Sequence, residues 1–104
     1  MLDDYEIAEE VVSECESFFH VDPRQKSRRV RVAKAKHICC YLLNKHTEMS
    51  TGEIGDYMGY KDHSTIRHAV QRVERDEVLL EFAQALWART SFHVNHPTIH
   101  RIAM

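Results

Sequence analysis

A helix boundary in the middle of the chain limits the possible folds more than any other feature. Ser50 and Glu53 have the S-x-x-E spacing in which a hydroxyl and a carboxylate bond to each other's backbone N–H groups at a helix start. Gly59 suits the left-handed position that ends a helix. Asp62 carries a short carboxylate that can accept from the free N–H groups of a new helix. The sequence therefore predicts two helices joined by about three residues, a helix-turn-helix over residues 50–75.

The second of these helices has two clearly different faces. Apolar residues recur at i, i+3, i+4 and i+7, which places them on one buried stripe: Ile66, Ala69, Val70 and Val73. We expect the opposite face to hold hydrogen-bonding and cationic groups, from His63, Ser64, Arg67, His68, Gln71, Arg72 and Arg75. Such a face suits the major groove of DNA.

The same residues resemble a known family. Lys-Asp-His-Ser-Thr-Ile-x-His-Ala at 61–69, preceded by Ser-x-x-Glu-Ile-Gly-Asp-x-x-Gly at 50–59, is similar to the motif of the C-terminal DNA-binding domain of the bacterial replication initiator DnaA. The resemblance covers about residues 8–75. It implies an all-α fold, a compact bundle of about five helices, and binding to double-stranded DNA.

By this resemblance, the start of the recognition helix meets base edges and phosphates in the major groove. The implied contacts are Lys61, Asp62, His63, Ser64, Thr65, Arg67 and His68. Their chemistry agrees in part, because Asp62 can accept from cytosine N4 and Thr65 offers a methyl to thymine or a hydroxyl to phosphate. Three positions depart from the family's usual pattern: Ser64 replaces a threonine, Lys61 an arginine, and Arg67 an apolar residue. These departures leave the target sequence open.

Charge is segregated along the chain, although the formal net charge is only −2. Residues 1–22 hold eight acids and no Lys or Arg, whereas residues 23–46 hold eight bases and no acid. Because the local field decides where a polyanion docks, we expect a basic loop over Arg24–Arg31 and the following helix to face DNA. The predicted contacts are Arg28, Arg29, Arg31, Lys34, Lys36, Ser50 and Thr51. The resemblance implies that the loop enters the minor groove, with Arg29 or Arg31 in that role.

Three further helices are predicted from apolar residues at helical spacing. One begins at Asp3 or Asp4 and stops before Pro23, one runs from about Val32 to Lys45, and the last from Asp76 to Phe92. Glutamates surround the outer face of the first helix, as a solvated face or as a contact surface for a protein partner. We predict one domain over residues 1–92 and a tail over 93–104, which is a second candidate for partner contact.

Metal binding and catalysis fit the sequence less well. The candidate metal ligands are His37 with Cys40, and the run His93, His96 and His100. Zinc needs four ligands that converge from two fixed elements, and neither group supplies them. Cys40 with a nearby histidine, or Asp62 with His63, has the residue types for catalysis, but the helix-turn-helix already accounts for both. We therefore predict no enzyme activity, metal, cofactor or small-molecule substrate.

No apolar run approaches the roughly 20 residues that cross a bilayer, and the N-terminus lacks the positive charge that opens a signal peptide. The three cysteines, two of them adjacent, do not resemble a secreted disulfide framework, and we expect reduced, half-buried thiols on helices. We therefore expect a cytoplasmic, nucleoid-associated bacterial protein.

At 104 residues the chain can form one modest core, and we expect no additional ATPase domain. Because we expect the DnaA-like domain to stand alone, the chain resembles a transcription regulator more than a replication initiator. One form would be an activator working with a partner protein, as in the phage-like gene-transfer-agent clusters of alphaproteobacteria. Two alternatives stay open: an accessory or antagonist of replication initiation that binds DnaA-box-like sites, and an interaction module that keeps the fold but binds protein.

Overall fold

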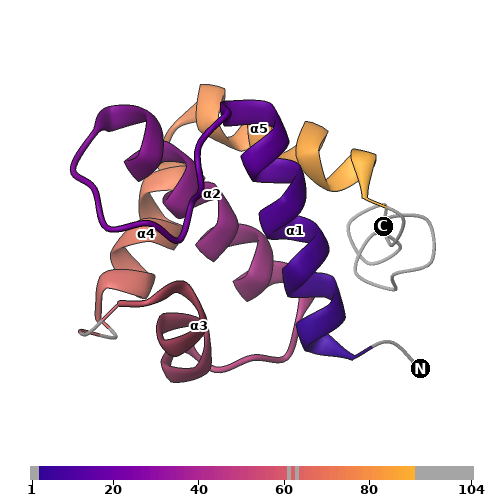
Figure 1. The fold of residues 1–104 in the computed structure, drawn as a ribbon, viewed down its shortest axis with the longest axis vertical. Helices are drawn as coiled ribbons and strands as arrows, with labels where there is room; N and C mark the ends of the chain where they lie inside the picture. Colours follow the sequence, from indigo (N-terminus) through magenta and orange to yellow (C-terminus); the bar gives the residue numbers. More distant parts are fainter. Residues whose placement is uncertain (1–2, 61, 63, 91–104) are drawn as a thin grey trace.

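A computed structural model describes residues 3–60, 62 and 64–90 of the chain. Within these residues it consists of five α-helices, with no strand (Figure 1). In chain order they are α1 (Asp4–Phe19), α2 (Val30–His46), α3 (Thr51–Met58), α4 (Ser64–Arg75) and α5 (Glu77–Arg89). The predicted all-α class is confirmed, and α3 and α4 form the helix-turn-helix. The predicted tail over residues 93–104 lies outside the described part of the chain.

Helix α2 is the central element and contacts each of the other four helices (Figure 1). Its buried residues are Val32, Ala35, Ile38, Cys39, Cys40, Tyr41, Leu42, Leu43 and His46. A helix that is buried on this much of its circumference belongs in the interior of a fold. The other helices are therefore arranged on α2, with α4 packed on α2, α3 and α5, and α1 packed on α2 and α5.

The start of α1 follows from its capping residues, and its end was not predicted. The Asp3 carboxylate accepts from the Tyr5 N–H at 2.9 Å, and the Glu6 carboxylate accepts from the Asp3 N–H at 3.4 Å. We expected Pro23 to stop this helix, but α1 ends at Phe19. His20 takes a left-handed conformation with φ 59°, and its N–H donates to the Glu16 carbonyl, which closes the last turn.

The helix-turn-helix forms as its sequence predicts. The Glu53 N–H donates to Ser50 Oγ at 3.1 Å, and the Ser50 N–H donates to Glu53 Oε1 at 2.9 Å, which starts α3. Gly59 has φ 82°, a conformation that suits a residue without Cβ. Its N–H donates to the Asp56 carbonyl at 3.3 Å, and the Tyr60 N–H donates to the Gly55 carbonyl at 2.8 Å. This pair of bonds is the Schellman motif, which ends α3 and turns the chain toward α4.

Two other helix limits differ from the expected ones. Helix α2 begins at Val30 instead of Val32, so Arg31 lies in its first turn and not in a loop. The last helix was expected to run from Asp76, and Asp76 does stand at its start, as a cap that accepts from the Val78 and Leu79 N–H groups at 3.0 and 3.2 Å. Helix α5 nevertheless ends at Arg89, because the Thr90 N–H and hydroxyl both donate to the Trp87 carbonyl. The predicted end at Phe92 is wrong for this reason, and Phe92 itself lies outside the described residues.

The core contains three free cysteines, Cys15, Cys39 and Cys40, each 0% exposed. We expected half-buried thiols, but burial is complete because α1 packs directly on α2. In the described part of the chain no helix is long and apolar enough to cross a membrane. Within the same residues, no three histidine, cysteine or acidic side chains come together to hold a metal ion. His93, His96 and His100 lie outside this description.

Candidate nucleic-acid interface

Helix α4 has the two faces expected of a recognition helix. Ile66, Ala69 and Val73 are buried in the core, and Val70 is half-buried. On the outer side Ser64, Arg67, His68, Arg72 and Arg75 are exposed, and Thr65 and Gln71 are half-buried. Lys61 and His63, which were also expected there, lie outside the described residues. The exposed face therefore offers guanidinium, imidazole, amide and hydroxyl groups to the surroundings.

Asp62 organises the start of α4. Its Oδ1 accepts from the Ser64 N–H at 3.0 Å and from the Ser64 hydroxyl at 2.8 Å. Its backbone carbonyl accepts from the Thr65 N–H at 3.1 Å. These bonds are the ones that a short carboxylate can supply to the free N–H groups of a first turn. Asp62 thus has a structural role besides any contact with a base.

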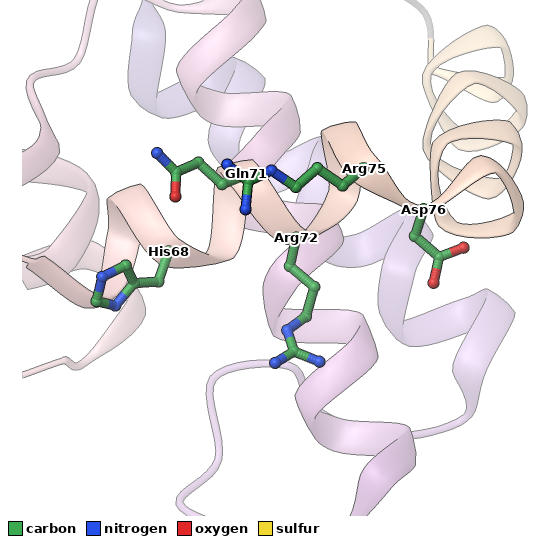
Figure 2. A pocket seen from close by; sticks show the side chains of 5 residues that line it. All are labelled: His68, Gln71, Arg72, Arg75 and Asp76. Carbon is green, nitrogen blue, oxygen red and sulfur yellow. The ribbon is translucent and has the colours of Figure 1, made fainter.

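A shallow groove of about 460 Å³ lies along the second half of α4 and continues to the start of α5. Its lining is mostly basic and polar, and consists of His68, Gln71, Arg72, Arg75 and Asp76 (Figure 2). In Figure 2 the Arg75 side chain runs back along α4 toward Gln71, whereas the Arg72 guanidinium points away from Gln71. Arg72 and Arg75 were expected on this outer face, at i+4 and i+7 from His68, but were not among the predicted DNA contacts. They extend the basic surface beyond the start of α4.

His37, in the first half of α2, lies close enough to Arg72 of this groove to be affected by its charge. Burial lowers the pKa of its imidazole, and the positive charges of Arg72 and Lys36 lower it further. The imidazole therefore favours its neutral form in the free protein. A phosphate placed beside it would have the opposite effect, because a negative charge stabilises the imidazolium.

The residues before and at the start of α2 form what we call the basic segment, residues 24–36. Of its predicted contacts, Arg28, Arg29, Arg31 and Lys34 are exposed and Lys36 is half-buried. The Arg29 N–H donates to Ser27 Oγ at 3.2 Å, which shapes the chain just before the helix. The first turn of α2 carries no acid, so the positive end of the helix dipole adds to the local field.

The basic segment lies close to the helix-turn-helix in space. The Arg24 guanidinium carbon is 4.4 Å from the centre of the Tyr57 ring, and Lys36 Nζ is 5.4 Å from the centre of the Tyr60 ring. Ser50 and Thr51 stand at the start of α3, where both are exposed. The Ser50 hydroxyl accepts from the Glu53 N–H, and its own hydrogen can be donated to a phosphate oxygen.

Comparison with known families decides what kind of interface this is. Residues 8–73 match the family described as the bacterial DnaA protein helix-turn-helix, a range that begins in α1 and ends in α4. The chain belongs to this family. The DnaA helix-turn-helix is a non-catalytic domain that binds double-stranded DNA, and this chain is therefore a DNA-binding protein of the DnaA type.

Individual relatives lead to the same family. The chain is 39% identical over 57 residues to the chromosomal replication initiator protein DnaA of Gloeobacter violaceus, which is 55% of this chain and 13% of the relative. It is 42% identical over 57 residues to the protein of that name from Borrelia garinii, covering 55% and 12%. For Bacteroides fragilis DnaA the identity is 43% over 49 residues, covering 47% and 10%. The matched part of the chain thus spans about an eighth of the length of these two DnaA proteins from Gloeobacter and Borrelia. No solved structure matches it.

Proposed function

We propose that the chain binds double-stranded DNA with a sequence preference. In this proposal the start of α4 enters the major groove, and the basic segment follows the adjacent backbone and minor groove. The observation that carries it is the division of α4 into an apolar face, with Ile66, Ala69 and Val73 buried, and an outer face of cationic and hydrogen-bonding groups. The basic segment, which contains no acid, lies against the same helix-turn-helix through Arg24 and Lys36.

The base-reading residues proposed for α4 are those at and before its first turn. Lys61, Asp62, His63, Ser64 and Thr65 would meet base edges and nearby phosphates, with Arg67 and His68 one turn further on. Arg28, Arg29, Arg31, Lys34, Lys36, Ser50 and Thr51 would contact the sugar-phosphate backbone, with an arginine of the segment in the minor groove.

We propose transcription regulation as the role that this binding serves. The support is chemical: Arg67 is exposed on α4 where the family usually has an apolar residue, which adds a cation to the recognition surface. A changed surface favours a target of its own over the family's usual box. A protein partner would then dock away from DNA, on the acidic surface of α1 or on residues 93–104.

A second candidate role is an accessory or antagonist of replication initiation. It is favoured by the relatives, which are named chromosomal replication initiator proteins and are about 40% identical over the matched residues. An interaction module that keeps the fold but binds protein alone is the third candidate.

Selection of binding sites from a library of random duplexes separates these roles. Recovery of a motif different from the DnaA box is the result expected for a regulator. Recovery of the DnaA box itself would favour the replication role. A library that gives no enriched motif would overturn sequence-specific binding and leave the interaction module. The matched control is the Arg67→Leu variant, which restores an apolar residue at that position and should shift the selected motif toward the box.

A further inference from the structure

The two parts of the proposed DNA surface are joined by contacts between cations and tyrosine rings. Arg24 stands over the Tyr57 ring at 4.4 Å, and Lys36 over the Tyr60 ring at 5.4 Å. Both distances lie within the roughly 6 Å over which a cation is attracted to an aromatic face. The two cations are the first and last residues of the basic segment, and the two rings belong to the end of α3 and to the turn before α4. The segment is therefore attached to the helix-turn-helix at both of its ends.

The backbone at these contacts is also fixed. The Arg24 N–H donates to Asp22 Oδ1 at 2.9 Å, which sets the direction of the chain there. The Arg24 carbonyl oxygen lies 4.0 Å from the point where a Cβ on Gly59 would be, so this loop touches the turn itself. On the other side of the contact, the Tyr60 N–H is held by the Gly55 carbonyl in the Schellman motif.

The tyrosines are anchored independently of the cations. Tyr57 and Tyr60 both pack against the hydrophobic core, and the Tyr57 ring lies 5.8 Å from the Tyr5 ring at an interplanar angle of 59°. Burial raises the pKa of both phenols, and the opposing effect of Arg24 on Tyr57 is smaller. Both rings are therefore neutral at physiological pH and attract the cations through their faces.

We propose that Tyr57 and Tyr60 are positioning residues that hold the basic segment in register with α4 before DNA arrives. The proposal rests on the proposed function, because it takes both surfaces to contact one duplex. A preformed register matters because ordering a flexible segment on binding costs conformational entropy, which lowers the affinity. It also sets the spacing between the contacts in the major and minor grooves. In this arrangement Arg24 acts through the Tyr57 ring and not through a phosphate.

The first test needs no DNA and measures the register directly. Nitroxide labels at Lys26→Cys and Gln71→Cys report the distance between the basic segment and α4 by pulsed electron paramagnetic resonance, while the native cysteines are buried and react slowly. A narrow distance distribution is expected for the parent protein and for Tyr57→Phe, and a broad one for Tyr57→Leu. The control is Tyr41→Leu, a buried tyrosine of α2 outside these contacts, which should keep the narrow distribution. A narrow distribution in Tyr57→Leu would overturn the proposal.

The second test is a double-mutant cycle of DNA affinity on the best selected duplex. Tyr57→Leu and Arg24→Gln should each weaken binding about two- to fivefold, the range of a cation–aromatic contact at a partly exposed site. The double variant should lose no more than either single one, since both remove the same contact. Tyr57→Phe should bind within error of the parent, and thermal unfolding checks that every variant is folded.

Three results of this cycle would overturn the proposal. Losses that add would show that Tyr57 and Arg24 act separately. A Tyr57→Phe variant as weak as Tyr57→Leu would assign the effect to the hydroxyl. A flatter dependence of affinity on salt in Arg24→Gln, by about one unit, would make Arg24 a phosphate contact. If the parent protein fails to bind duplex DNA, the proposed function fails, and the label distances still decide whether the tyrosines set the register.

Discussion

Single residues at the start of α4 are already constrained before any ligand is present. The Ser64 hydroxyl donates to Asp62 Oδ1, so its hydrogen is in use. Toward DNA, Ser64 can then only accept, and the major-groove donors are the amino groups of adenine and cytosine. The same carboxylate starts the helix by accepting from the Ser64 N–H. A substitution of Asp62 would therefore change helix stability and base recognition together, which makes it a poor probe of either.

Better probes are His63→Ala and Thr65→Ala, because these side chains are proposed to meet base edges. Each should cost on the order of 1–3 kcal/mol of binding free energy on the best selected site and much less on random duplexes. Paired titrations on both duplexes measure the difference. Glu81→Ala, on the exposed side of α5, is the control that should change neither affinity. Equal losses on the two duplexes would contradict a base-reading role.

His37 gives a prediction about pH and stability. Burial, followed by Arg72 and Lys36, lowers the pKa of its imidazole in the folded protein. Just below the ordinary histidine pKa of about 6.5, the unfolded chain then binds more protons than the folded one, so the free energy of unfolding falls as pH falls. Urea unfolding between pH 7.5 and 5.5, values chosen to bracket that pKa, should show a smaller loss of stability for His37→Gln than for the parent.

The exposed His68 supplies the matched control for this measurement. His68→Gln removes an exposed histidine from the outer face of α4, and this variant controls for the change from histidine to glutamine itself. If His37→Gln and His68→Gln give the same slope of stability against pH, the buried imidazole is not the group responsible.

At the level of elements, the basic segment, which includes the first turn of α2, is expected to attract the phosphates of DNA. Arg28 and Arg29 precede the helix, and Arg31 lies within its first turn, where there is no acid. Each phosphate that a cation neutralises releases condensed counterions, which makes affinity depend on salt. The segment should therefore contribute to binding on every duplex, with an additional preference if one arginine enters a narrow A·T minor groove.

Replacing Arg28, Arg29 or Arg31 singly by alanine should weaken binding and flatten the plot of log affinity against log salt by about one unit per phosphate contact. An arginine in the minor groove should in addition lose more affinity on A·T-flanked sites than on G·C-flanked ones. Titrations at several salt concentrations on both duplexes give these numbers. Arg89→Ala removes the same charge from the far end of α5, where it pairs with Glu14, and should leave the slope unchanged. If the variant that lacks all three arginines binds as tightly as the parent at every salt concentration, the segment is only a solvated connector.

Those elements that depend on local chemistry could be predicted from the sequence. Ser50 with Glu53, Gly59 and Asp76 each act on backbone groups within four residues, so their spacing alone fixes helix limits. The apolar stripe of α4 was also predictable, because one periodicity separates its buried and exposed faces. The DNA-binding class followed from the motif between residues 50 and 69.

Features that depend on contacts between distant segments could not be predicted. The ring under Arg24 belongs to Tyr57, on a helix that follows two others, and nothing near Arg24 in the sequence indicates it. His20 lacks the conformational freedom of glycine, and no local pattern marked it as a helix end, yet it takes the left-handed conformation after Phe19. Val30 lies between two arginines and is 69% exposed, so no apolar periodicity marked it as the first residue of α2.

On the scale of the whole molecule, the acidic α1 and the basic surface of the basic segment and α4 are separate. Helix α1 contains six acids and no Lys or Arg and packs on α2 and α5, whereas the basic segment contains no acid and α4 exposes Arg67, Arg72 and Arg75. A duplex is attracted to the basic surface and repelled by α1, so this separation would orient the protein during its approach. In the proposed binding mode, α1 would also stay accessible while DNA is bound.

Charge reversal on α1 tests whether that acidic surface has a partner. Glu9→Lys and Glu16→Lys change exposed acids and leave the pair between Glu14 and Arg89 intact. The double variant should bind DNA with equal or higher affinity, more so at low salt, because two repulsive charges are removed. Loss of activity at a reporter that carries the selected site, with DNA binding retained, is the result expected for a partner surface. Full activity in the cell would show that α1 is a packing helix whose acidic face is only solvated.

The rate at which the three core thiols are chemically modified can report how often the folded core opens. Burial raises the pKa of Cys39, and that of Cys40 to about 12, so neither sulfur is a thiolate or accessible in the closed fold. An alkylating reagent can reach them only after α1 separates from α2, and α2 contacts every other helix. The rate of modification would therefore follow the opening of the whole core and not the motion of a single loop. Without any introduced probe, the same cysteines would show how much a bound duplex slows that opening.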